Sequence, residues 1–287
     1  MTISVPINAR LMFGGAKYCF AKFLDQTTVE RVQNPDAICG NRDPLIDRTA
    51  SGRRRVMFTT WSDLTVPIIQ YLLPLAGTTL SVATYTANQT VGTSEIIIDK
   101  GAAVHKYTDV RLARIIIRGQ VGTMPISAEC LWIAEDEIED SGTSWVDGTV
   151  DGIFPFTGTT YEIATVSVDL DRFAIVIDNK LVQSWNSSAT VTDIGPGPRQ
   201  TLLAVSCPYI SGNKDYYWDN RDSAAGVQQQ LTITNGEDTL EFNIPKAVLN
   251  PESPSIEGAL EEIRLPMTWE AHRQSATAAF NFVLTNG

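Results

Sequence analysis

Residues 230–244 read Gln-Leu-Thr-Ile-Thr-Asn-Gly-Glu-Asp-Thr-Leu-Glu-Phe-Asn-Ile, and this stretch indicates the class of the fold. On both sides of Asn235-Gly236, apolar and polar residues alternate, which is the two-residue period of a β-strand with one buried face. Asn and Gly both tolerate the positive φ of a tight turn, so the pair is a strong hairpin signal. The stretch therefore predicts two antiparallel strands joined by a turn.

Similar patterns recur along the rest of the chain. Runs rich in Val, Ile, Thr and aromatic residues are separated by turn residues such as Gly14-Gly15 and Gly195-Pro196-Gly197. The predicted strands are Arg10–Phe13, Val56–Thr60, Thr79–Tyr85, Glu95–Ile98, Leu112–Arg118, Ile126–Ile133, Ile163–Asp169, Phe173–Ile177, Leu202–Cys207, Gln230–Thr234, Leu240–Ile244, Arg264–Glu270 and Ala278–Leu284. Because short strands dominate, we predict a mainly β protein built from β-sandwiches or β-barrels.

Two stretches favour short helices that flank the sheets. Ser62–Ala76 begins with Ser and Asp, carries Pro67 early, and places apolar residues on one face before Gly77. Asp219–Gln230 is a second candidate, although Gly226 interrupts it.

The charge of the chain is strongly acidic and unevenly distributed. The 287 residues carry a net charge of −11, which opposes non-specific binding to nucleic acid or to an anionic membrane. Residues 1–60 hold nine Lys and Arg against five Asp and Glu, a net of +4, which leaves −15 on residues 61–287. We predict that the basic segment, with its cluster Arg53, Arg54 and Arg55, contacts the acidic face of a neighbouring copy. The alternative is a solvated loop.

The cysteines and the apolar segments suggest synthesis in a reducing cytoplasm. The four cysteines show no CxxC spacing and no nearby paired histidines, so neither a metal site nor a disulfide scaffold is expected. Cys130 and Cys207 lie in apolar runs, which predicts buried free thiols. The chain begins without the apolar stretch of a signal peptide and has no apolar run of 18 residues, so no membrane partner is expected.

The two halves of the chain contain similar blocks in the same order. The matching blocks are Val110-Arg111-Leu112 with Ile263-Arg264-Leu265, and Arg10 to Lys17 with Arg172 to Lys180. Each half also places a helix candidate between a first and a last group of strands. We therefore predict a duplication, with tandem domains at 1–150 and 151–287 joined by the acidic stretch between Glu135 and Gly152.

The sequence offers little catalytic chemistry. The chain has no phosphate-binding loop, GxSxG, HExxH or glycine-rich nucleotide motif. His105 and His272 each stand next to a basic residue, without a paired nucleophile. We therefore predict that the protein is not an enzyme and needs no metal or cofactor.

An acidic run offers three interpretations. It contains seven acids and no basic residue, at Glu135, Asp136, Glu137, Glu139, Asp140, Asp147 and Asp151. Clustered carboxylates can bind Ca²⁺, but the EF-hand pattern is absent. A glycosidase needs two carboxylates held about 5–9 Å apart, which a flexible loop does poorly. We favour a solvated acidic loop that faces a shared channel.

A rival hypothesis is a monomeric β-sandwich that binds or hydrolyses carbohydrate, with tryptophans as a stacking platform and acids as catalysts. Against it, Trp132 and Trp269 lie in alternating strands, which predicts core packing. Tyr216-Tyr217-Trp218 is the run most typical of an interface anchor, because aromatic residues dominate interface energetics.

Six segments, taken in order, resemble those of a known family. They are Val66–Gly77, His105–Val110, Ile115–Gln120, Pro125–Ala128, Phe173–Lys180 followed by Pro198-Arg199, and Phe280–Phe282. The layout is similar to that of the tail tube proteins of long-tailed, non-contractile bacteriophages, in the larger form with two tube domains in one chain. The resemblance covers most of the chain and rests on patterns, and residues 20–55 match poorly.

This resemblance implies a β-sandwich with a flanking helix in each domain. Inward sheets of several subunits would join into a trimeric, pseudo-sixfold ring, and rings would stack into the tail tube of a virion. The partners would be copies of the chain and other tail proteins, with DNA passing through the lumen without specific binding. A heterologous contact that does not close generates a filament, and paired edge strands remove exposed edges. Another virion component, such as a decoration or tail-tip protein, is a closer alternative.

The resemblance also suggests roles for charged residues. An acidic channel wall would repel phosphates and let DNA slide. Asp169 and Asp171 are spaced by two, so in a strand they would share a face that cannot be the core. The candidates for the lumen or an interface are Asp169, Asp171, Glu135, Asp136, Glu137, Glu139 and Asp140, with Arg53, Arg54 and Arg55 at contacts between subunits.

Overall fold

A computed structural model provides the structure of the chain. It describes residues 10–13, 16–18, 22–33, 49–100, 103–122, 125–140, 142, 144, 152–186, 188, 190–251, 263–274 and 277–286. Strands form most of this part of the chain, with two short helices, so the mainly β prediction is confirmed.

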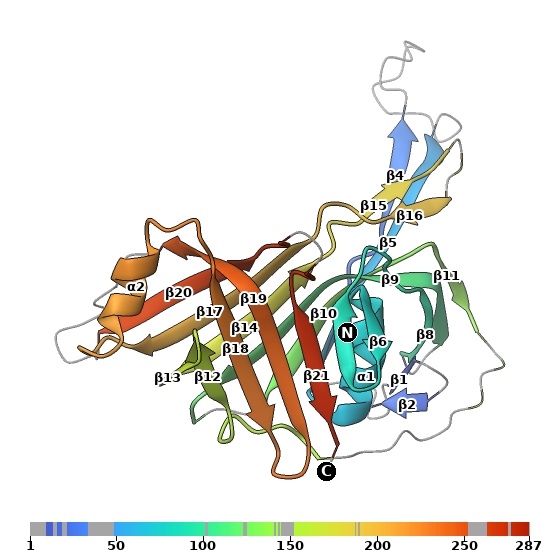
Figure 1. The fold of residues 1–287 in the computed structure, drawn as a ribbon. Helices are drawn as coiled ribbons and strands as arrows, with labels where there is room; N and C mark the ends of the chain where they lie inside the picture. The colour runs from blue at the N-terminus through green and yellow to red at the C-terminus, as the bar shows by residue number, and fades with distance from the viewer. Residues whose placement is uncertain are drawn as a thin grey trace.

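The first half of the chain is a series of strands around one helix (Figure 1). Its elements are β1 (Arg10–Phe13), β2 (Ala16–Tyr18), β3 (Lys22–Asp25), β4 (Thr28–Gln33), β5 (Thr49–Asp63), α1 (Val66–Leu75), β6 (Thr78–Ser81), β7 (Thr84–Ala87), β8 (Ser94–Asp99), β9 (Val104–Gln120), β10 (Ser127–Ala134) and β11 (Asp136–Glu139).

The second half is built in a similar way. Its elements are β12 (Thr160–Ile163), β13 (Val166–Val168), β14 (Arg172–Asp178), β15 (Val182–Ser184), β16 (Asp193–Gly195), β17 (Gln200–Pro208), α2 (Lys214–Asn220), β18 (Val227–Thr234), β19 (Thr239–Pro251), β20 (Arg264–Ala271) and β21 (Asn281–Thr285).

One antiparallel sheet runs through both halves, and we call it the continuous sheet. Its eight strands pair in the order β3–β5–β10–β9–β14–β17–β20–β19. Residues alternate between a buried and a partly exposed face, as Ile115 and Ile117 do with Arg114, Ile116 and Arg118 on β9. In the described part of the chain, the sheet therefore has one face on the core and one open face, of which the β15–β16 segment covers one part.

Most of the remaining strands, together with the helices, cover the core side of this sheet, whereas β4, β15 and β16 project away from it (Figure 1). The long strands β9 and β19 belong to both layers. The first part of β9 pairs with β8 and β11 and its last part with β10 and β14. Likewise, β19 pairs with β18 and β21 near its start and with β20 at its end. The result is a sandwich whose layers are joined by bent strands.

The core between the layers is apolar and continuous across both halves. Trp132 and Trp269 are both fully buried, as predicted, and so are the thiols of Cys130 and Cys207. Burial raises the pKa of Cys207 to about 12, which keeps this thiol protonated.

Several local predictions were wrong. The predicted strand Ile163–Asp169 is a hairpin, β12–β13, with a turn at positive φ on Ala164 and Thr165. Thr79–Tyr85 is likewise a hairpin, β6–β7. The second helix ends at Asn220, near the start of the stretch predicted for it, because that stretch leads into β18. Alternation alone does not distinguish one strand from two short ones that fold back.

The hairpin of residues 230–244 was predicted correctly. It joins β18 to β19, with Thr234 opposite Thr239. Gly236 has a φ of +100°, and Asn235 accepts hydrogen bonds at Oδ1 from the backbone N–H groups of Glu237 and Asp238. Asn235 and Gly236 therefore turn the chain within a loop of four residues, between Thr234 and Thr239.

Candidate assembly surfaces and the ionic cluster beside them

Two series of strands repeat the same pairings. The first is β1, β2, β3, β5, β8, β9, β10 and β11, and the second is β12, β13, β14, β17, β18, β19, β20 and β21. In each series the first strand pairs with the second and with the fifth, as β1 does with β2 and β8. The third strand pairs with the fourth, as β3 does with β5. The seventh strand pairs with the fourth and with the sixth, as β10 does with β5 and β9. The sixth strand also pairs with the fifth and the eighth. A helix follows the fourth strand in both.

The buried tryptophans mark matching positions in the two series. On β10, Trp132 lies opposite Phe58 of β5, and on β20, Trp269 lies opposite Leu203 of β17. Two residues farther along these partner strands, Phe23 and Phe173 occupy matching places on β3 and β14.

The sequence blocks that suggested a duplication do not coincide with this match. Val110–Leu112 lies in β9, whereas Arg264 and Leu265 lie in β20, which corresponds to β10. Arg10 lies in β1, but Arg172 begins β14, which corresponds to β3. The proposed domain boundary at 150–151 lies outside the described residues.

The two series meet edge to edge at β9 and β14. Seven residue pairs form this junction, from Arg114 opposite Asp178 to Gln120 opposite Arg172. A second contact joins β21 to β7, with Phe282 opposite Tyr85. The last strand of the second series therefore also binds the first half.

Arg199 fastens the two halves at another point. Its Nε donates to Asn179 Oδ1 at 3.0 Å, and its Nη2 donates to the carbonyl of Asn88 in the first half. Its guanidinium also lies 5.8 Å from the ring centre of Phe280. Gly77, with a φ of +83°, leaves room for it, since a Cβ there would stand 2.6 Å from Nη2.

Among the residues that the structure describes, both ends of the continuous sheet have open edges. In the described part of the chain, β3 pairs only with β5, while its counterpart β14 pairs on both sides. At the other end, residues 248–251 of β19 pair with β20 but extend past β18. The hydrogen bond from Gln26 N to Met57 O directs the backbone N–H of Asp25 toward the open edge.

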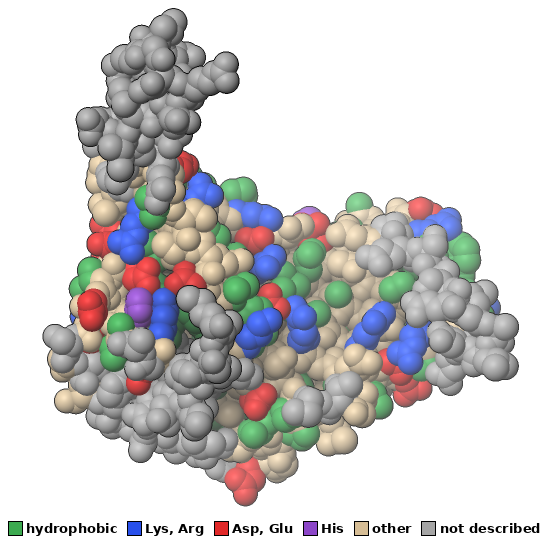
Figure 2. Space-filling view, turned by 180° about the vertical axis from the view of Figure 1, so that it is seen from behind, with side chains coloured by type: hydrophobic (Ala, Val, Ile, Leu, Met, Phe, Trp, Pro, Cys, Tyr) green, Lys and Arg blue, Asp and Glu red, His purple; other side chains and the backbone are tan. Residues whose placement is uncertain are grey.

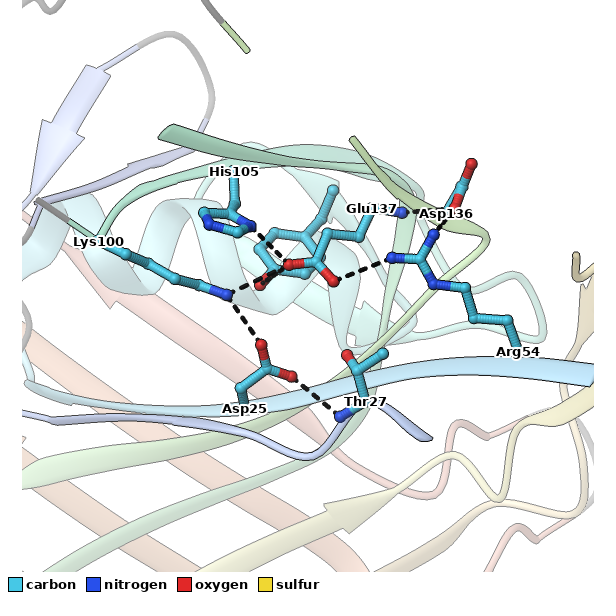
Figure 3. Close-up of polar contacts among 8 residues, drawn as sticks. Asp25, Thr27, Arg54, Lys100, His105, Asp136 and Glu137 are labelled. Atoms are coloured by element: carbon cyan, nitrogen blue, oxygen red, sulfur yellow. Dashed lines mark hydrogen bonds and ion pairs between the residues drawn. The ribbon is translucent and has the colours of Figure 1, made fainter. Parts of the chain in front are cut away.

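A cluster of charged groups surrounds Glu137 next to the β3 edge (Figure 3). Glu137 Oε1 accepts hydrogen bonds from His105 Nδ1 at 2.7 Å, Tyr107 Oη at 3.0 Å and Lys100 Nζ at 3.2 Å. Its Oε2 accepts one from Arg54 at 3.2 Å. Lys100 Nζ also lies 2.8 Å from Asp25 Oδ2 on β3. We call these six residues the ionic cluster.

The surroundings tune the carboxyl groups of this cluster. Burial acts to raise the pKa of Glu137, but Lys100 and the hydrogen bonds from His105 and Tyr107 outweigh it, so the pKa lies below its ordinary value. The pKa of Asp25 is lowered in the same way, against its burial, mainly by Lys100. Both carboxylates are therefore stabilised as anions.

The acidic run was predicted to be a solvated loop, and this was wrong for its first part. Residues 136–139 form β11, which pairs with β9 from Thr108 to His105. The pairing turns Glu137 inward, and Asp136 Oδ1 lies 2.9 Å from Arg54 Nη1. A long-range strand pair, which the run itself does not show, causes this order. Asp147 and Asp151 lie outside the described residues.

The other acidic candidates lie apart from one another. Glu139 is exposed, while a hydrogen bond shared with Asp109 raises the pKa of Glu135. Asp140 follows β11, and its Oδ1 accepts a hydrogen bond from Gly142 N. Asp169 is exposed in the connection after β13 and is not in a strand, so its alternation with Asp171 does not define a sheet face.

The arginine cluster contacts other parts of the same chain. Arg54 belongs to the ionic cluster, whereas the guanidiniums of Arg53 and Arg55 lie 5.3 and 5.7 Å from the ring centre of Trp185. Trp185 Nε1 donates to the carbonyl of Arg54 at 3.2 Å. These contacts hold the β15–β16 hairpin against the projecting β4–β5 arm (Figure 1). A role between subunits stays a prediction.

The open face of the continuous sheet carries charges of both signs. Figure 2 shows Lys and Arg side chains in a row across the hollowed middle of this side of the molecule. On the part of this face that the β15–β16 segment leaves uncovered, the basic residues are Lys22, Arg114, Arg118, Arg172 and Arg264, and the acidic ones are Asp63, Glu129, Asp178 and Glu270. This face is therefore close to neutral, and an acidic channel wall stays a prediction.

Within the described ranges, no three His, Cys, Asp or Glu side chains converge as metal ligands would. No helix in this part of the chain is long and apolar enough to cross a membrane. A scan against protein-family models and a search of curated proteins found no match to the chain.

Proposed function

We propose that this protein is a structural subunit that assembles with copies of itself into rings and then into a tail tube, the conduit through which a long-tailed bacteriophage delivers its genome. The observation that carries the proposal is the β9–β14 junction together with the two open edges. The chain already contains one edge-to-edge contact between its two series. The free edges of β3 and β19 are the two surfaces that a second contact of this kind needs.

The geometry of the second contact follows from the match between the series. Because β3 corresponds to β14 and β19 to β9, the edge of β3 in one copy fits the free end of β19 in another. The contact uses different surfaces on the two copies, so it is heterologous and closes into a ring or continues as a helix. It also pairs strand edges that would otherwise favour uncontrolled association.

The contact between chains would be weaker than the one within the chain. The hydrogen bond from His272 N to Lys246 O shows that the backbone polar groups of even-numbered β19 residues point toward β20. Those of odd-numbered residues, Pro251 among them, therefore point toward the open edge. Proline has no N–H to donate there. Fewer backbone hydrogen bonds make this contact more reversible than the β9–β14 junction.

The size of a ring supports a conduit. Three chains of eight strands would form a 24-stranded barrel, matching the trimeric ring that the tail tube resemblance implies. At about 4.8 Å between strands, this barrel measures about 115 Å around and about 37 Å across its backbone, before strand tilt widens it. The open face of the sheet would line the bore, where DNA passes, and other tail proteins would cap the tube in the virion.

A matched pair of variants tests this proposal. Asp25→Pro removes the outward N–H of β3 and places ring carbons on the edge, whereas Asp25→Asn removes the same charge and keeps the N–H. We expect wild type and Asp25→Asn to form trimeric rings and tubes in mass photometry and electron microscopy, and Asp25→Pro to stay monomeric. A wild-type monomer at high concentration, or a ring of six chains, would contradict the proposal. Normal tubes from Asp25→Pro would exclude the β3 edge as the contact.

A further inference from the structure

The open face of the continuous sheet differs in charge from the rest of the molecule. The chain has a net charge of −11, yet five basic side chains against four acidic ones point to this face. The acids Asp63, Asp178 and Glu270 lie near strand ends, and Asp178 forms an ion pair with Lys180 at 2.9 Å. The middle of the face is therefore basic.

Carboxylates pair with three of the five basic residues and offset two of their three positive charges. Glu129 lies 2.9 Å from Arg118 and 3.8 Å from Arg114, and it also accepts a hydrogen bond from Trp61 Nε1 at 3.1 Å. Glu129 thus offsets one of two positive charges. Asp171 lies 3.2 Å from Arg264 and offsets the positive charge of this residue, at the other end of the row of basic side chains.

Lys22 and Arg172 have no such compensation among the described residues. Lys22 Nζ lies 4.6 Å from the ring centre of Trp61, a contact that keeps its charge available. Arg172 is exposed and borders a hollow of about 640 Å³ on the open face, where Ala174 and Ala204 are small. The two cations occupy matching positions, each directly before a phenylalanine on β3 or β14.

We propose that Lys22 and Arg172 are contact points for the phosphate backbone of duplex DNA. This proposal rests on the proposed function, because a tube turns the open face toward its cargo. In a ring of three chains, the two residues alternate and form a collar of six cations at one height, spaced four strands or about 19 Å apart. Contacts to phosphates read no sequence, and so few of them hold DNA weakly enough for it to slide.

The collar differs from the repelling acidic wall that the net charge suggested. Repulsion from all sides would centre the DNA, whereas a cationic collar in a near-neutral wall guides it by brief contacts. Salt dependence separates the two, because each phosphate contact releases counterions when it forms.

The test compares Lys22→Gln/Arg172→Gln with Lys214→Gln/Arg221→Gln. Both variants lose two positive charges, but the second pair lies on and just after α2, off the open face. Binding of a fluorescent 24-base-pair duplex to unassembled Asp25→Pro protein is measured by anisotropy from about 20 to 200 mM salt. The host variant keeps the open face accessible, and circular dichroism confirms that each protein is folded.

We expect the collar variant to bind at least about tenfold more weakly at the lowest salt, with a log–log salt slope shallower by about 1–2. The control variant should behave like its parent. Equal binding by the two double variants, or no salt-dependent binding by the parent, would overturn the proposal. The failures are distinguishable. Tubes without binding that depends on Lys22 and Arg172 leave the proposed function standing, whereas such binding by a chain that never forms rings refutes the tube and the collar and leaves only the two phosphate contacts.

Discussion

The ionic cluster of the first half and a phenylalanine cluster in the second half occupy corresponding places. Strand β11 lies against β9 as β21 lies against β19. In the first half this place holds Glu137 and its basic partners. In the second half it holds Phe242, Phe280 and Phe282, whose ring centres lie 4.7–6.0 Å apart and which are almost fully buried.

The difference shows that one backbone arrangement can be stabilised by opposite chemistry. Packed phenylalanine rings contribute burial energy that hardly depends on pH or salt. An ionic cluster contributes only while its charges are paired, and its desolvation cost offsets much of the gain. The permanent contact between β21 and β7 adjoins the apolar cluster, whereas the ionic cluster reaches the open β3 edge through Asp25. The ionic cluster, whose contribution to stability depends on pH and salt, thus lies next to the proposed contact between copies.

The largest effect is expected in the apolar cluster. Phe242→Ala removes a fully buried ring and leaves a cavity between two others, so the free energy of unfolding should fall by about 3–5 kcal/mol. Urea denaturation measures it, with Phe242→Leu as a control that should lose less than about 1.5 kcal/mol. A loss below about 1 kcal/mol for Phe242→Ala would show that the cluster is not tightly packed.

A smaller loss is expected in the ionic cluster. Glu137→Ala leaves Lys100 and Arg54 partly buried without their shared carboxylate, so the free energy of unfolding should fall by about 2–3 kcal/mol. The exposed neighbour Glu139 provides the control, since Glu139→Ala should change stability by no more than about 0.5 kcal/mol. Equal effects of the two changes would mean that the cluster contributes nothing specific.

The two clusters should also respond differently to acid. The pKa values of Glu137 and Asp25 are depressed, so their stabilisation is complete above the ordinary values of 4.5 and 3.8 and disappears as pH falls through the lower folded values. Unfolding titrations between pH 7 and pH 3 should therefore show a loss of stability that Glu137→Gln diminishes. Phe242→Leu should retain the full loss, and a variant-independent pH profile would contradict this role of the cluster.

The smallest effect concerns the arm. Arg53→Gln/Arg55→Gln removes two cation–π contacts to Trp185, each contributing about 0.5–1 kcal/mol at an exposed site. Thermal unfolding should shift by a few degrees, as it should in Trp185→Leu. If the arginine variant also slows polymerisation while Trp185→Leu does not, the arginines contact a neighbouring copy, as the sequence predicted. Equal polymerisation rates would confine their role to the arm.

Local patterns in the sequence determined the class of the protein. The alternation around Trp132 and Trp269 predicted strands with buried tryptophans, and Asn235-Gly236 predicted a hairpin. Both signals concern residues close in sequence, where side-chain period and turn chemistry act directly. For the same reason, α1 was predicted in nearly its correct place from Pro67 and the apolar face that follows it.

Only the tertiary structure decided which strand pairs with which, because hydrogen-bond partners lie far apart in the chain and leave no local period. The acidic stretch 136–139 is polar enough for a loop, yet its pairing with β9 makes it a strand and collects Asp25, Arg54 and Lys100 around Glu137. In the same way, the repeated pairings relate Lys22 to Arg172, residues whose sequence surroundings show only a shared phenylalanine. Short-range chemistry specified the strands, and long-range pairing placed the charges.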